Sequence, residues 1–138
     1  MNFKKLTQSQ KQVYLAKAEI TLVSEKLFLK CDLSLGDLAK ESGIQLHTLS
    51  HLINSQANQN FRDYINVMRI GYFKEKVNDT GWKDFTVEQM VTACGFNSRA
   101  TAHRAFIRHV GAAPSEYLKL HRLQYDHRTV PKKGYNFG

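Results

Sequence analysis

An internal repeat with an offset of 52 to 53 residues constrains the fold of this chain more than any other feature of its sequence. In each copy, three apolar residues at helical spacing precede a glycine, and a second apolar helix pattern follows it. After the glycine, Ile53 corresponds to Phe106, and residues 61–65 correspond to residues 114–118. Two tandem copies are stronger support than one, because many single helical hairpins share this pattern. The first set is Leu35, Leu38, Ala39 and Gly43, and the second is Val87, Met90, Val91 and Gly95.

Apolar residues recur at helical spacing along most of the chain, and strand-like alternation is scarce. A short helix, a glycine turn and a second helix together form the pattern of a helix-turn-helix. The sequence therefore predicts an all-α protein in which two helix-turn-helix subdomains are joined by a linker helix, with an additional N-terminal helix. The expected elements are short helices that end at Gly43 and Gly95, and longer helices over about residues 9–29, 45–54, 60–78, 98–110 and 114–123.

Helix breaks and composition divide the chain into four expected parts. Residues 1–32 form an N-terminal helix or connector, and residues 33–78 form the first helix-turn-helix subdomain with the linker helix. Residues 79–123 form the second subdomain, and residues 124–138 form a flexible basic tail. The tail is expected because its end contains one proline and two glycines without apolar periodicity.

The N-terminal helix carries a regular apolar stripe. Its apolar residues follow steps of three and four, which predicts a single apolar helix face. Two heptads are too few to establish a coiled coil. The stripe could dock onto the chain's own domain or associate with a second copy of the chain. Its members are Val13, Ala16, Ile20, Val23 and Leu27.

The charge of the chain is strongly basic and uneven. The sequence holds 20 Lys and Arg residues against 12 Asp and Glu residues, a formal net charge of +8. Residues 99–138 hold eight basic residues against two acids, so this segment alone carries +6. A protein this basic usually meets an anionic partner, most often nucleic acid or a lipid surface.

Composition excludes several classes of protein. Apolar residues make up 42% of the sequence, which excludes a disordered tail, and no stretch approaches the roughly 18 apolar residues of a membrane span. The residues after the basic start are too polar for the core of a signal peptide. Cys31 and Cys94 have no CxxC spacing and cannot make a disulfide framework. We therefore expect a cytoplasmic protein that binds a polyanion.

The second copy carries a set of specific motifs. Residues 95–98 read Gly-Phe-Asn-Ser, residues 104–106 read Arg-Ala-Phe, and residues 111–117 read Gly-Ala-Ala-Pro-Ser-Glu-Tyr. These motifs resemble the C-terminal signature of the AraC/XylS family of transcription regulators. Residues 49–54 and 60–70 of the first copy resemble the first motif and the connecting helix of the same family. The resemblance covers about residues 33–121.

The resemblance implies a compact unit of seven helices with two helix-turn-helix subdomains, each placing its second helix in a major groove of double-stranded DNA. The implied function is sequence-specific transcription regulation in the bacterial cytoplasm, in association with the nucleoid. No cofactor, metal or enzymatic activity is expected. RNA polymerase, and an effector or sensor domain outside this chain, are further expected partners.

Four positions depart from the family pattern. Val91 replaces the usual Ala before the turn, and Leu118 replaces the usual Arg after the Tyr. Phe73 replaces a usual Ala in the linker helix, whereas Ala102 replaces a usual aromatic residue in the second reading helix. Enlarging one core position while shrinking another can conserve volume. We therefore hypothesise that Phe73 fills the space left by Ala102.

A reading helix needs an apolar face toward its domain and a polar face toward base edges. The apolar residues Leu49, Leu52 and Ile53 form the face of the first helix that packs on its domain. The resemblance implies that the histidines and arginines on the outward faces of both helices contact bases. Arg can fork onto guanine O6 and N7, whereas His reads one acceptor, so we expect the first helix to be the weaker reader. The outward residues are His47, Thr48, Ser50 and His51 in the first helix and Arg99, Ala100, His103 and Arg104 in the second.

Helix N-termini and basic side chains are expected to bind phosphates. A linker helix of about 18 residues would span about 27 Å, close to the roughly 34 Å between successive major-groove faces. A monomer could then cover two grooves, its site need not be palindromic, and the DNA would bend. The phosphate-contact residues are Ser34, Asn60, Arg62, Asn97, Ser98, Arg108 and Lys119.

Three other interpretations stay open. The helix-turn-helix module could serve as a protein-docking surface instead of reading DNA. His47 and His51, four residues apart, could share a zinc ion, but no third ligand lies nearby in the sequence. Cys94 could act as a nucleophile with His103 or His109, although nothing supplies an oxyanion site. As a residue at the turn, Cys94 is better interpreted as a small buried filler.

Overall fold

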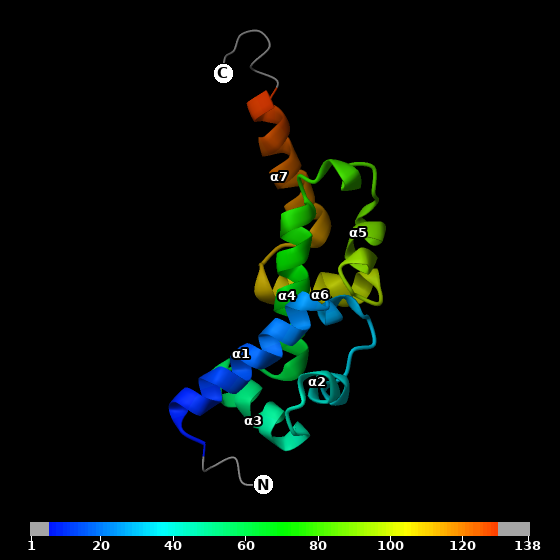
Figure 1. Cartoon of the computed structure of the whole chain (residues 1–138). Coiled ribbons are helices and arrows are strands. Elements are labelled where there is room, and N and C mark those ends of the chain that lie inside the picture. The colour runs from blue at the N-terminus through cyan, green and yellow to red at the C-terminus, as the bar shows by residue number, and fades with distance from the viewer. Residues whose placement is uncertain (1–5, 130–138) are drawn as a thin grey trace. The chain divides into compact units, whose positions relative to one another are not determined.

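The computed structural model describes residues 6–129, with side chains described through residue 122. Over this range the chain is all-helical (Figure 1), which confirms the predicted fold class. The elements are α1 (Gln8–Ser24), the 3-10 helix η2 (Leu27–Leu29), α2 (Leu35–Ser42), α3 (Leu46–Gln56), α4 (Phe61–Lys76), the 3-10 helix η3 (Thr80–Trp82), α5 (Val87–Ala93), α6 (Arg99–His109) and α7 (Pro114–Thr129).

The chain divides into two compact units, Met1–Arg69 and Ile70–Gly138, with the boundary inside α4. The helix expected to end near residue 123 continues to Thr129 as α7. The remainder of the expected basic tail, from residue 130, lies outside the described residues.

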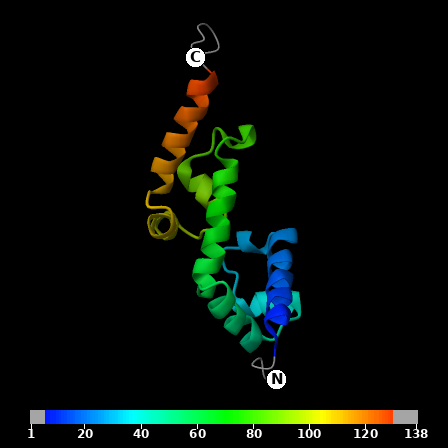
Figure 2. The same cartoon turned by 90° about the vertical axis from the view of Figure 1, so that its left-hand side faces the viewer.

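In the first unit, α1 packs against α2, α3 and η2 (Figure 2), so this helix is part of the fold of that unit. Its buried residues are Ala18 and Leu22, both fully inaccessible. The predicted stripe instead faces outward: Val13 is 65% exposed, Ile20 66% and Val23 55%. The helical spacing of the stripe is confirmed, but the buried face of α1 is the one that carries Ala18 and Leu22.

Each unit contains the expected turn between its two helix-turn-helix helices. Gly43 and Gly95 adopt left-handed backbone conformations, with φ angles of 75° and 103°. A side chain is strained in this region, so glycine is the residue that ends these short helices without cost. The short helices also begin alike, because Ser34 and Thr86 each form a capping box with the residue three positions later.

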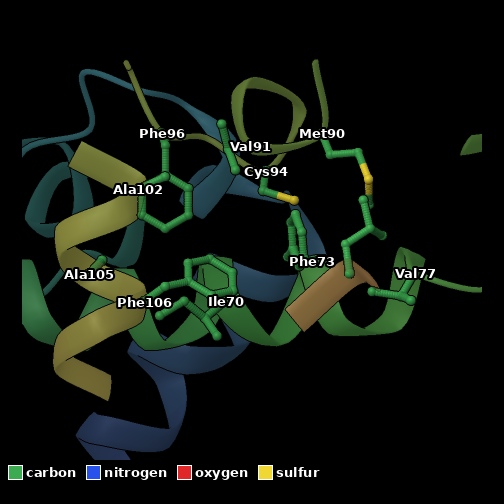
Figure 3. Packing of buried hydrophobic residues seen from close by; sticks show 11 residues of the cluster. Ile70, Phe73, Val77, Met90, Val91, Cys94, Phe96, Ala102, Ala105 and Phe106 are labelled. Carbon is green, nitrogen blue, oxygen red and sulfur yellow. The ribbon is translucent and has the colours of Figure 1, made fainter. Parts of the chain in front are cut away.

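The core of the second unit contains both residues of the compensation hypothesis (Figure 3). Phe73 and Ala102 are fully buried in one cluster, together with the unusual Val91. The ring of Phe73 meets the ring of Phe106 edge-on, with a centroid separation of 4.9 Å. In Figure 3 the ring of Phe96 lies beside Ala102, whereas Phe73 packs against Phe106, so the compensation of Ala102 by Phe73 stays a hypothesis.

An arginine pair extends the repeat beyond the motifs visible in the sequence. Arg69 donates from Nε to the carbonyl oxygen of Phe28 and from Nη2 to that of Lys30, both at 2.7 Å. Arg122, 53 residues later, donates to the carbonyl oxygens of Val77 and Trp82 at 3.4 and 3.1 Å. In each unit an arginine of the third helix thus anchors the 3-10 segment that precedes the helix-turn-helix.

Candidate nucleic-acid interface

The two second helices of the repeat, α3 and α6, correspond residue by residue. Each contains 11 residues, and their first residues, Leu46 and Arg99, are 53 positions apart. Because the lengths and the offset agree, each residue of α3 has a counterpart in α6. The two surfaces can therefore be compared position by position.

The core-facing sides of both helices are apolar with one exception. Leu49, Leu52 and Ile53 are buried in α3, and Ala102, Ala105 and Phe106 are buried in α6. Thr48, expected to face outward, is only 3% exposed. It lies four residues before Leu52, and residues at this spacing share one side of a helix. The side chain of Thr48 is therefore unavailable to a base edge.

The outward side of α6 is basic. Arg99, Ala100, His103 and Arg104 are all exposed, as expected, and Arg108 continues this surface toward the C-terminal end of the helix. The sequence of α6 contains no acidic residue. Ser98 caps the helix by accepting a hydrogen bond from the Thr101 N–H at 3.1 Å, which fixes the start of the helix beside Arg99.

The outward side of α3 has a different chemistry. His47 is exposed, whereas Ser50 and His51 are half-buried. The helix contains no Lys, Arg, Asp or Glu residue. Leu46, which the outward set from the sequence omitted, is 49% exposed at the first position. The repeat offset contained the missing signal, because it pairs Leu46 with Arg99.

A helix-turn-helix domain model matches residues 38–120, which is more than half of the chain. The chain belongs to the AraC-type helix-turn-helix family. It is accordingly a DNA-binding transcription regulator at the level of that family, which is regulatory and not enzymatic.

A solved structure of a Listeria innocua protein of unknown function has the same fold as this AraC-type chain. The two are 24% identical, with a TM-score of 0.61, and the match covers 78% of this chain and 95% of the other. No curated protein sequence matches this chain. In the described range, no helix is long and apolar enough to cross a membrane.

The predicted phosphate-contact residues of this AraC-type protein are all on the surface. The side-chain oxygens of Ser34, Asn60 and Ser98 each accept the N–H of the residue three positions later, so they cap α2, α4 and α6. A phosphate would therefore meet the backbone N–H groups at these helix starts rather than the capping oxygens. The side chains of Arg62, Asn97, Arg108 and Lys119 are exposed.

The described residues support neither a zinc site at His47 and His51 nor a nucleophile at Cys94. Among the residues that the structure describes, no group of three or more His, Cys, Asp and Glu side chains could hold a metal ion, so His47 and His51 have no third protein ligand there. Cys94 is fully buried in the core of the second unit, as predicted for a small filler. Burial raises the pKa of its thiol to about 12, which disfavours the nucleophilic thiolate.

Proposed function

We propose that this AraC-type regulator reads DNA sequence through the outward faces of α3 and α6, each inserted in a major groove. The observation that carries the proposal is the exposed surface of α6, where Arg99, Arg104 and Arg108 extend from a helix without acidic residues. Positive charge of this kind attracts DNA and supplies side chains that can fork onto guanine.

The proposed base-reading set is smaller than the set expected from the sequence. In α6 the set keeps its four members. The arginines are proposed to bind guanine, His103 to bind a single acceptor, and Ala100 to make an apolar contact with a base. In α3, Thr48 is excluded because it is buried. The set is His47, Ser50, His51, Arg99, Ala100, His103 and Arg104.

Phosphates are assigned to the exposed basic side chains and to the capped helix starts. Arg62, Arg108 and Lys119 provide side-chain contacts in this proposal, and the backbone at the helix starts marked by Ser34, Asn60, Asn97 and Ser98 provides the other contacts. These contacts set orientation and affinity but carry no sequence information. RNA polymerase and a sensor domain remain proposed partners.

We further propose that one monomer covers two successive major grooves and bends the DNA. A site of this kind would lack a twofold axis, because the two outward faces differ in chemistry. Leu46 and His47 open α3, whereas Arg99 and Ala100 open α6. A single-groove reader would instead select a consensus confined to one major groove.

Selection of bound fragments from random DNA, followed by footprinting, tests the proposal. We expect a non-palindromic consensus that spans two grooves and is bound at least 10³-fold more tightly than random DNA. The double substitution Arg99→Ala and Arg104→Ala should remove the preference at the base pairs that α6 contacts. Lys83→Ala is the matched control, because Lys83 is an exposed cation of the second unit outside α6, and it should leave the consensus unchanged. Absence of DNA binding at low salt would contradict the proposal and favour the protein-docking interpretation.

A further inference from the structure

The first position of α3 differs from that of α6 in a way that points to a specific ligand group. Leu46 and Arg99 occupy the same position of the repeat, and each begins its helix. Leu49, one turn further along the same side of α3, is fully buried, but Leu46 remains 49% exposed. An apolar side chain therefore stands at the helix start, where α6 has a cation.

The chemistry around Leu46 limits what it can recognise. Leucine has no donor or acceptor, so it cannot read the hydrogen-bonding pattern of a base edge or bind a phosphate. α3 has no Lys or Arg to fork onto guanine, and the exposed neighbours of Leu46 are the neutral Gln45 and the imidazole of His47. The first residues of a recognition helix contact base edges. At the edge of a base in the major groove, the apolar group available to such a side chain is the C5-methyl of thymine.

We infer that Leu46 is a specificity-determining residue that selects thymine by contact with its C5-methyl group. This inference rests on the proposed function, because it requires α3 to lie in the major groove. It goes further by dividing the recognition between the two units: α6 reads guanine through arginine, and α3 reads a methyl group through leucine. A base that presents a polar group to Leu46 is disfavoured, because that group loses water without gaining a partner.

Replacement of thymine by deoxyuridine tests the inference, because the substitution removes only the methyl group and keeps the hydrogen-bonding groups. Each thymine of the selected site is replaced in turn, and the affinity of the whole chain is measured for each duplex. We expect one position at which the wild-type protein binds deoxyuridine roughly threefold to tenfold more weakly than thymine, the effect of losing about one buried methyl contact. Leu46→Ala should bind both duplexes equally at that position.

Two further variants sharpen the experiment. Val67→Ala removes an exposed apolar side chain of α4 in the same unit, and it should keep the wild-type preference for thymine. Leu46→Arg introduces the side chain of the α6 counterpart, and it should change the selected base at that position from thymine to guanine. Because Leu46 is half exposed, thermal unfolding monitored by circular dichroism should confirm that its variants remain folded.

The outcomes separate this inference from the function on which it rests. Specific binding that is insensitive to every deoxyuridine replacement overturns the inference and leaves the proposed function intact. A preference for thymine that survives in Leu46→Ala also overturns it, because another residue would then contact the methyl group. Failure of the chain to prefer any DNA sequence overturns both, and it would assign the apolar start of α3 to protein docking.

Discussion

Arg104 and Arg108 both extend from α6 into solvent, but they lie one helical turn apart and have different expected roles. Arg104→Ala should relax the preference at one base pair, with a loss of about 1–3 kcal/mol of discrimination, because it removes a forked contact to guanine. Arg108→Ala should weaken binding to all sequences about equally and reduce the salt slope by about 1. Competition binding with a panel of single-base variants distinguishes the two effects. Equal relaxation at a base pair by both substitutions would contradict these assignments.

Leu22 and Ile20 test which face of α1 is buried. Leu22 is inaccessible, so Leu22→Ala should lower the free energy of unfolding by about 2–5 kcal/mol. Ile20, two residues away on the same helix, is exposed, and Ile20→Ala should change that free energy by no more than about 0.5 kcal/mol. Urea unfolding monitored by circular dichroism measures both values. A comparable loss of unfolding free energy for Ile20→Ala would show that the predicted stripe is buried in solution. If that loss depends on the protein concentration, the stripe is buried by association with a second copy.

At the scale of the element, the capping boxes of α2 and α5 have the same geometry but different responses to pH. The N–H of Ser34 donates to the Asp37 carboxylate at 3.0 Å, and the N–H of Asp37 donates to the Ser34 hydroxyl at the same distance. The hydrogen bond from the Ser34 backbone, then that with its side chain, lowers the pKa of Asp37, with smaller contributions from Lys30 and Lys40. In α5 the equivalent residue is the neutral Gln89.

The box in α2 should therefore weaken in acid. Since the folded-state pKa of Asp37 lies below its unfolded value, the stabilisation is complete above the unfolded pKa and is lost as pH falls through the folded pKa. Asp37→Asn should be less stable than wild type at pH 7, and this difference should shrink as the pH falls below about 4, because the wild-type carboxylate then becomes protonated. Gln89→Ala is the control, and its destabilisation should be the same at both pH values. Thermal unfolding at pH 7 and pH 3 tests this, and a pH-independent difference between Asp37→Asn and wild type would contradict it.

At the scale of the whole molecule, the net charge of +8 should make binding to DNA strongly dependent on salt. With about six to eight phosphate contacts, the logarithm of the affinity should fall with the logarithm of the salt concentration with a slope of about −5 to −7. Titrations at several salt concentrations on the selected site measure this slope. A slope near zero would remove the electrostatic part of the proposed interface.

Most of the fold was predictable because its signals are local. Ser34, Gly43 and Gly95 mark helix ends through interactions within a few residues, and the repeat showed that both copies adopt the same arrangement. The all-α class follows from these features, whereas the regulator family was indicated by the resemblance of the motifs in residues 95–117. Two residues of α3 differ from the expectation and were predictable only in part. The spacing of Thr48 from Leu52 indicated burial, but the exposure of Leu46 was not evident from the same periodicity.

The sequence by itself determined where the helices begin and where the two short helices end, because capping and glycine turns act between residues that are close along the chain. It did not determine the ends of α1 and α7, which lie at Ser24 and Thr129 instead of near residues 29 and 123. Only the tertiary structure decided which face of α1 is buried. The regular stripe of Val13, Ile20 and Val23 remains on the surface, whereas Ala18 and Leu22 are buried in α1, the helix that packs against α2 and α3. The arginine anchors from Arg69 and Arg122 were decided in the same way. Burial depends on the shape of the partner surface, and that surface is built from residues distant in the chain.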